Sequence, residues 1–127
     1  MTEGYYIVMS NPTPGQDEEY DRWYGEEHMP QTVEQIDGMT GGQRFRRVDV
    51  DGLSSPFPRH MVAYSFDPVD AQLVNESLLR QRQEREAALA QGRQPKLYIS
   101  DAMDMTSLQS GLFVPVGARV TGPRIRD

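Results

Sequence analysis

Residues 20–30 read Tyr-Asp-Arg-Trp-Tyr-Gly-Glu-Glu-His-Met-Pro and hold the only tryptophan of the chain, two of its six tyrosines and one of its two histidines. In a helix, residues three and four positions apart share a face. That face collects the residues at i, i+3, i+4, i+7 and i+8, which are Tyr20, Trp23, Tyr24, Glu27 and His28. An aromatic wall that ends in a titratable imidazole makes this helix a candidate small-molecule site.

Strands and helices alternate around this segment in a regular order. The first helix, residues 16–29, is predicted to end or bend just after His28, because Pro30 disfavours the helical conformation of the residue before it. A second helix is predicted over residues 67–91, with a mostly solvated charged middle at residues 80–86 and Gly92 as its stop. Apolar alternation and breaker clusters predict strands at residues 5–10, 43–50, 59–67 and 96–101, and a further extended segment at residues 111–120.

This order, β-α-β-β-α-β, is the ferredoxin-like pattern of the α+β class, with one antiparallel sheet and both helices on one of its faces. A chain of 127 residues is long enough for one hydrophobic core, so we expect a single domain over residues 1–127. Helices on one side only would leave the other, apolar face of the sheet exposed to solvent. Pairing of two such sheets in a homodimer is the simplest way to bury it.

Composition excludes several classes of function. The net charge of −6 disfavours nucleic acid as a partner, since phosphate binding relies on clustered basic residues. No apolar run approaches the roughly 20 residues that cross a bilayer, and the start of the chain is unlike a secretory signal, so we expect a cytoplasmic protein without a membrane partner. The absence of cysteine removes disulfides and thiolate chemistry.

Residues 19–30, followed by Gly38-Met39 and by Arg44-Phe45-Arg46, resemble the dimeric α+β barrel superfamily and, within it, the EthD-like branch. Proteins of this kind recurrently carry an acidic-Trp-Tyr-x-x-x-His-x-Pro helix that leads through a glycine turn into a strand with an arginine-aromatic pair. The motifs are dense over residues 5–50, whereas over residues 59–121 the resemblance rests on element order. It implies a homodimer whose sheets pair into a barrel, with a small-molecule pocket between sheet and helices in each subunit.

The resemblance implies several kinds of chemistry, because such proteins include cyclases, lyases, isomerases and monooxygenases. We expect an enzyme of secondary metabolism that carries out cofactor-independent acid–base chemistry on an aromatic or polyketide-like carbonyl compound. One alternative is a monooxygenase, either cofactor-free or haem-dependent. The other is a protein that binds a small apolar or aromatic molecule without catalysis.

In this hypothesis His28 is the proton shuttle, because an imidazole exchanges protons near neutral pH. The alternative is a histidine that only interacts with the dipole at a helix C-terminus. Tyr20 and Tyr24 would donate hydrogen bonds to a developing oxyanion, and Trp23 would form an apolar wall. The same three rings are more typical of a packed core than of a ligand platform, since large rings on the inner face of a helix usually fill space there.

Four further residues are candidate substrate contacts. Glu27 is either an orienting carboxylate or a solvated side chain. His60 and Tyr64 share a face of the third strand, which points either toward the helices or into the barrel between subunits. Arg44 is either surface charge or the anchor for a substrate carboxylate. Two distant histidines without cysteine make a metal site improbable, and no loop has the pattern that cradles a nucleotide phosphate, so we expect neither a metal nor a nucleotide cofactor.

Overall fold

The computed structural model describes residues 2–125 and shows one antiparallel sheet in the order β2-β3-β1-β4. The order of the strands in space differs from their order along the chain because β1 lies between the last two strands. The strands are β1 (Gly4–Pro12), β2 (Met39–Arg46), β3 (His60–Phe66) and β4 (Met103–Phe113).

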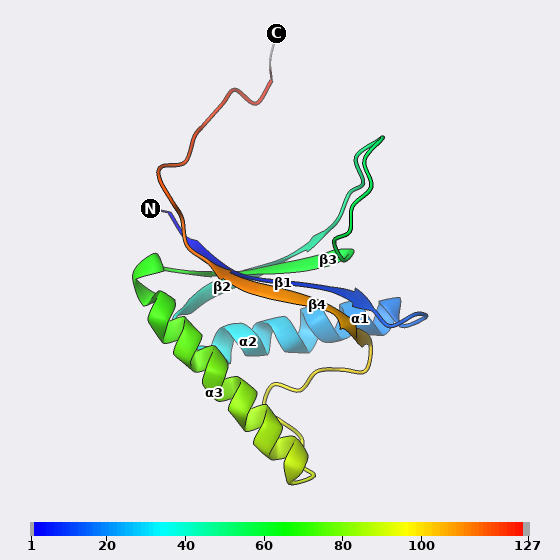
Figure 1. Cartoon of the computed structure of the whole chain (residues 1–127). Helices are drawn as coiled ribbons and strands as arrows, with labels where there is room; N and C mark the ends of the chain where they lie inside the picture. Colours follow the sequence, from blue (N-terminus) through cyan, green and yellow to red (C-terminus); the bar gives the residue numbers. More distant parts are fainter. Residues whose placement is uncertain (1, 126–127) are drawn as a thin grey trace.

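The helices cover a single face of this sheet (Figure 1). The first helical segment consists of α1 (Asp17–Trp23), the π-helical turn η1 (Tyr24–His28) and α2 (Met29–Gln35). The second begins with the 3-10 turn η2 (Pro68–Asp70), where the Asp67 side chain accepts a hydrogen bond from the Val69 amide, and continues as α3 (Ala71–Ala90). The predicted ferredoxin-like α+β fold is therefore confirmed.

Of the two outcomes predicted just after His28, an end or a bend, the helix does not end there but passes through a π-helical turn over Tyr24–His28 into α2. In the π-helical turn the Met29 amide donates to the Tyr24 carbonyl, five residues earlier, instead of four. Pro30 then falls in the first turn of α2, where a missing N–H is tolerated. The wider turn thus accommodates the proline, and the helical segment continues to Gln35.

The last predicted strand was misplaced. Residues 96–101 belong to an irregular loop at residues 91–102, and the strand that pairs with β1 is β4. The predicted extended segment at residues 111–120 is strand only as far as Phe113, and β2 covers Met39–Arg46 instead of residues 43–50. Leu97 and Ile99 alternate as in a strand, but they pack against the helix-facing core instead of pairing with a neighbouring strand.

The core lies between the helices and the inner face of the sheet. Val62, Tyr64 and Phe66 of β3 are all at most 2% exposed. Val62 and Tyr64 pack with the buried aromatic residues of the first helical segment, which are Tyr20, Trp23 and Tyr24, whereas Phe66 packs with Ile36, Val74 and Leu97. The face of β3 that carries His60 and Tyr64 therefore points toward the helices.

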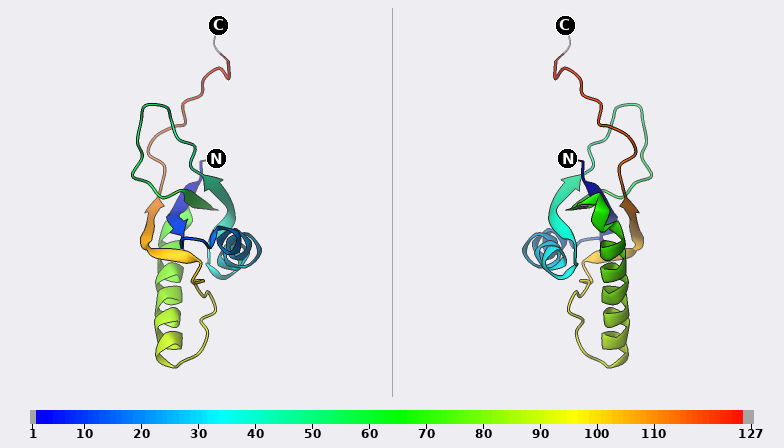
Figure 2. Two further views of the ribbon diagram at one scale, coloured as in Figure 1. Left: turned by 90° about the vertical axis from the view of Figure 1, so that its right-hand side faces the viewer. Right: turned by 90° about the vertical axis from the view of Figure 1, so that its left-hand side faces the viewer.

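Two segments extend to the side of the sheet away from the helices, the β2–β3 connection at residues 47–59 and the tail at residues 114–125 (Figures 1 and 2). Both carry exposed apolar side chains, among them Val48, Leu53, Val116 and Val120. Across residues 2–125, no helix combines the length and the apolar character that a bilayer span requires.

Candidate functional site

A cavity of about 150 Å³ lies on the helix side of the sheet, and we call it the His28 cavity. Its apolar wall comes from the inner sheet face, from α3 and from the loop at residues 91–102, and includes Val8, Leu78, Leu97, Ile99 and Met103. Its side chains with polar atoms are Tyr6, Tyr24, His28, Thr32, Tyr64, Gln81, Arg82, Arg85 and Ser110. The cavity is thus mostly apolar with a few polar groups, as small-molecule sites usually are.

His28 lies at the end of the π-helical turn, on the aromatic residues that precede it. Its ring stacks on Trp23 with 4.5 Å between centroids and meets the edge of Tyr24 at 5.2 Å. Burial, and secondarily the positive charge of Arg85, lowers the pKa of His28 to about 4. Its Nδ1 atom is buried and has no hydrogen-bond partner within residues 2–125. At neutral pH His28 is therefore an uncharged imidazole with an unused nitrogen.

Tyr64 projects into the same region from the middle of β3. Its side chain is 1% exposed, and within the described chain its hydroxyl has no hydrogen-bond partner. Burial raises the pKa of Tyr64 by more than the neighbouring Thr32 hydroxyl lowers it, so the phenol keeps its proton at neutral pH. The nearby Thr32 hydroxyl donates to the His28 carbonyl at 2.7 Å. The Tyr64 hydroxyl is therefore available as a donor to a ligand.

One face of α3 supplies polar groups that the sequence alone did not identify. Leu78, Gln81, Arg82 and Arg85 lie at i, i+3, i+4 and i+7 and all line the cavity. The Gln81 Oε1 atom is buried without a partner in residues 2–125. The predicted solvated surface at residues 80–86 is therefore only partly correct, since Gln81 and Arg85 are partly buried against the cavity, whereas Arg82 lines it and is exposed. That spacing, which begins at Leu78, is the signal in the sequence.

Tyr24, His28 and Tyr64 are the predicted site residues that line the cavity. Tyr20 lies in the core instead, where its hydroxyl pairs with the Ser10 hydroxyl at 2.6 Å. The His60 ring stands 5.0 Å from the Tyr20 ring, and His60 does not line the cavity.

The other predicted contacts also lie against side chains of the protein. Trp23 is fully buried beneath His28, and its Nε1 atom has no hydrogen-bond partner within residues 2–125. Arg44 pairs with Asp21 at 2.7 Å, and its guanidinium lies over the Tyr20 and Tyr24 rings. These contacts attach the first helix to β2. The structure thus gives Arg44 a role in packing without testing whether it also binds a substrate.

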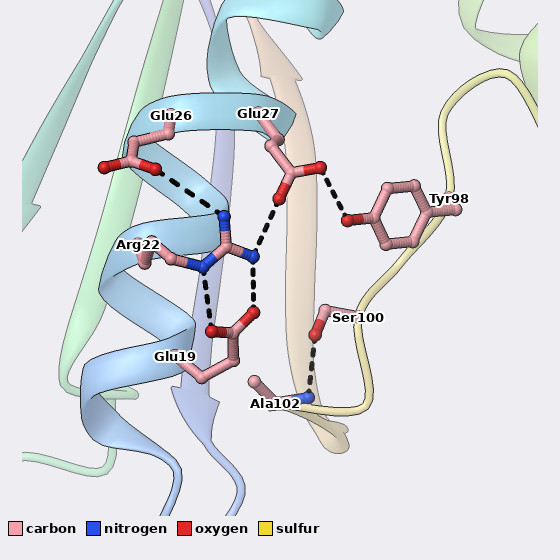
Figure 3. Close-up of polar contacts among 7 residues, drawn as sticks. All are labelled: Glu19, Arg22, Glu26, Glu27, Tyr98, Ser100 and Ala102. Carbon is pink, nitrogen blue, oxygen red and sulfur yellow. Dashed lines mark hydrogen bonds and ion pairs between the residues drawn. The ribbon is translucent and has the colours of Figure 1, made fainter.

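Glu27 links the first helical segment to the loop that covers the cavity (Figure 3). It accepts a hydrogen bond from the Tyr98 hydroxyl at 2.8 Å and pairs with Arg22 at 2.8 Å. The hydrogen bond from Tyr98, followed by that from Arg22, lowers the pKa of Glu27. Leu97 and Ile99, on either side of Tyr98, line the cavity. Glu27 therefore holds the loop in place and does not itself face the cavity.

Within residues 2–125, no cluster of three or more histidine, cysteine or carboxylate side chains is close enough to hold a metal ion.

Comparison of the sequence with protein-family models finds no match, and neither does comparison with curated proteins. Comparison with solved structures finds proteins of similar fold. A crystal structure of an ethyl tert-butyl ether D (EthD) family protein from Bacillus halodurans is similar, with a TM-score of 0.52 and 20% sequence identity, over 91% of this chain and 100% of that chain. The chain shares its fold with an EthD family protein.

A hypothetical protein from Arabidopsis thaliana has the same fold. Its solution structure gives a TM-score of 0.55 at 12% identity, over 94% of both chains. A crystal structure of a protein from the same plant gives a TM-score of 0.55 at 13% identity, over 94% of this chain and 100% of that chain. The predicted EthD-like resemblance is thus confirmed at the level of the fold, and none of these similar structures assigns a reaction to it.

Proposed function

We propose that the protein is an enzyme that moves protons on a small aromatic or polyketide-like carbonyl compound bound in the His28 cavity. The observation that supports this proposal most strongly is the pairing of two unused polar groups in one apolar cavity. The Nδ1 atom of His28 and the hydroxyl of Tyr64 are both buried without partners. Because unsatisfied buried polar atoms cost free energy, their presence points to a role in binding or catalysis.

The size of the cavity limits the part of a substrate that it encloses. A volume of about 150 Å³ is comparable to that of engineered cavities that bind benzene. The His28 cavity therefore suits one ring or a short folded chain. A larger substrate would extend past the α3 side chains.

The chemical step that this geometry suits is removal of a proton from the carbon next to a carbonyl group. The C–H bond breaks, the His28 imidazole takes the proton, and the electron pair forms an enolate. The Tyr64 hydroxyl donates a hydrogen bond to the enolate oxygen, as an oxyanion hole does. Return of the proton to the same or another atom completes an isomerisation, and cyclisation or carbon–carbon cleavage uses the same enolate.

The proposal is tested by exchange of α-protons with solvent, a reaction that needs only proton removal and return. We expect the protein to accelerate deuterium incorporation into 2-indanone or acetophenone in D₂O, followed by proton NMR. His28→Gln should reduce the catalysed rate at least about tenfold. A general base typically contributes about 10²–10⁴-fold to a rate, so a larger loss is consistent with the proposal. His60→Gln is the matched control, because it removes the other histidine outside the cavity.

Exchange that is equally fast with wild-type protein and His28→Gln would refute the role of His28. If these ketones bind the cavity but no exchange is accelerated, the protein is a non-catalytic binder instead, and its function differs from the one proposed. Binding alone would still raise the melting temperature.

We also propose that two copies pair through the outer sheet face. Tyr5, Phe45 and Phe113 are exposed there by 39%, 42% and 58%, and Ile7 and Met61 lie between them on the same face. An apolar surface of this kind favours association with another such surface. The His28 cavity lies on the opposite side of the sheet, so each copy would keep its own cavity.

A further inference from the structure

Two arginines, Arg82 and Arg85, line the wall of the His28 cavity. Six other arginines in the described part of the chain form ion pairs, namely Arg22, Arg44, Arg47, Arg59, Arg80 and Arg93. Within residues 2–125, neither Arg82 nor Arg85 forms one.

Carboxylates on α3 lie within reach in the sequence but are not used by these two side chains. Glu86 follows Arg82 by four residues, a spacing that favours a helical ion pair, yet no such pair forms. Glu84 instead pairs with Arg93 at 2.9 Å. Both free guanidinium groups belong to the wall of the His28 cavity.

Besides burial, the positive charge of this wall lowers the pKa of His28 in the candidate site. Arg85 is half-buried and near enough to His28 to disfavour its protonation. Arg82 is exposed to solvent, whereas Arg85 is partly removed from water, and no carboxylate of the described residues pairs with either. An anion bound at this wall would offset both charges. A planar guanidinium donates to carboxylate oxygens in a matching, two-pronged geometry.

We propose that Arg82 and Arg85 bind a carboxylate group of the substrate, while its ring or apolar chain fills the His28 cavity. The substrate class is therefore a small aromatic carboxylic acid that also carries a carbonyl group. This inference rests on the proposed function in one respect, since it takes the His28 cavity as the substrate site. It adds which end of the substrate faces α3 and which faces His28 and Tyr64.

The test compares carboxylates with their neutral amides, which have nearly the same size and shape. Benzoate and phenylacetate, and then benzamide and phenylacetamide, are titrated into the protein while NMR follows the ring signals of His28. We expect the carboxylates to shift these signals and to bind at least about tenfold more tightly than the amides, because charge-assisted hydrogen bonds are lost with the charge.

The double variant Arg82→Gln and Arg85→Gln should abolish this preference. Arg80→Gln is the matched control, because Arg80 lies on the same helix and pairs with Asp37 outside the cavity. It should leave the preference intact. Equal binding of carboxylates and amides, or a preference that survives the double variant, would overturn the proposal, as would the absence of any binding by all four compounds.

These outcomes separate this inference from the proposed function. If ketone exchange depends on His28 but carboxylates have no advantage over amides, the enzyme proposal stands and the carboxylate assignment is wrong. If ketones are not exchanged but the carboxylate preference depends on Arg82 and Arg85, the cavity is a carboxylate-binding site without the proposed catalysis.

Discussion

At the residue scale, the environment of His28 makes it a neutral base and links it to stability. Its folded pKa of about 4 lies below the ordinary value of 6.5, so the unfolded chain binds a proton first as the pH falls. We expect the free energy of unfolding to fall between about pH 6.5 and pH 4, by about 3 kcal/mol at about 1.4 kcal/mol per pKa unit. Urea denaturation at a series of pH values measures this loss.

His28→Gln should remove most of that pH dependence. The lowered pKa of His60 also makes the free energy of unfolding depend on pH, and below about pH 4.5 the lowered pKa values of Glu19, Glu27 and Glu84 do the same. These contributions are present in both proteins and cancel in the comparison. Identical pH dependence in the two proteins would show that His28 does not titrate as described.

Removal of the hydroxyl from Tyr64 and from Tyr20 should change the free energy of unfolding differently. Tyr64→Phe removes a hydroxyl without a partner, so the free energy of unfolding should stay the same or rise. Tyr20→Phe leaves the buried Ser10 hydroxyl unpaired and should cost about 1–3 kcal/mol. Chemical denaturation of both variants checks this. A loss of stability in Tyr64→Phe as large as in Tyr20→Phe would mean that the Tyr64 hydroxyl has a structural partner.

The sequence predicted the aromatic part of the cavity better than its charged part. Tyr24 and His28 share a helical face, and Tyr64 follows from strand alternation, so local periodicity was enough to select them. Arg82 and Arg85 lie in a run of charged residues, where only their i+4 and i+7 spacing from Leu78 distinguishes them from the other arginines of the run. The structure adds that neither has a carboxylate partner within residues 2–125.

At the element scale, Gly38 sets how closely the turn before β2 approaches α3. Its φ is +91°, and an added Cβ would lie 2.8 Å from Val74 Cγ2. Gly38→Ala should therefore lower the free energy of unfolding by about 1–3 kcal/mol, through backbone strain and a clash with a buried residue. Gly15→Ala is the control, since Gly15 also has a positive φ of +82° but no atom within 4 Å of the added Cβ.

In that pair, denaturation should show a clearly larger loss for Gly38→Ala than for Gly15→Ala. Equal losses would mean that strain alone acts and that the turn does not constrain α3.

The misplaced elements have a common physical reason. Alternation at Leu97 and Ile99 reflects burial of one side of a segment, and a loop that covers a cavity shows it as well as a strand does. Pro30 likewise disfavours an ordinary helix, but the π-helical turn before it removes the conflict. Local rules therefore identified the order of elements correctly and placed some of their ends wrongly.

At the scale of the whole molecule, the fold has one covered and one exposed sheet face. If the exposed face pairs two copies, sedimentation velocity should show a dimer for the wild-type chain and a monomer for Phe45→Glu, because a charge would be buried at the contact. Val69→Glu is the control, since Val69 is 86% exposed at the start of the α3 segment and away from that face. A monomeric wild-type chain at all concentrations would contradict the pairing.

The central claim, that neutral His28 takes a proton from a ligand in this cavity, is tested most directly by the pH dependence of catalysed α-proton exchange. A base is active only when deprotonated, so the catalysed rate should fall on acidification with a midpoint near pH 4 and stay level at neutral pH. His28→Gln should lack this acid limb together with most of the rate. A midpoint that is the same in wild-type protein and His28→Gln would contradict the claim.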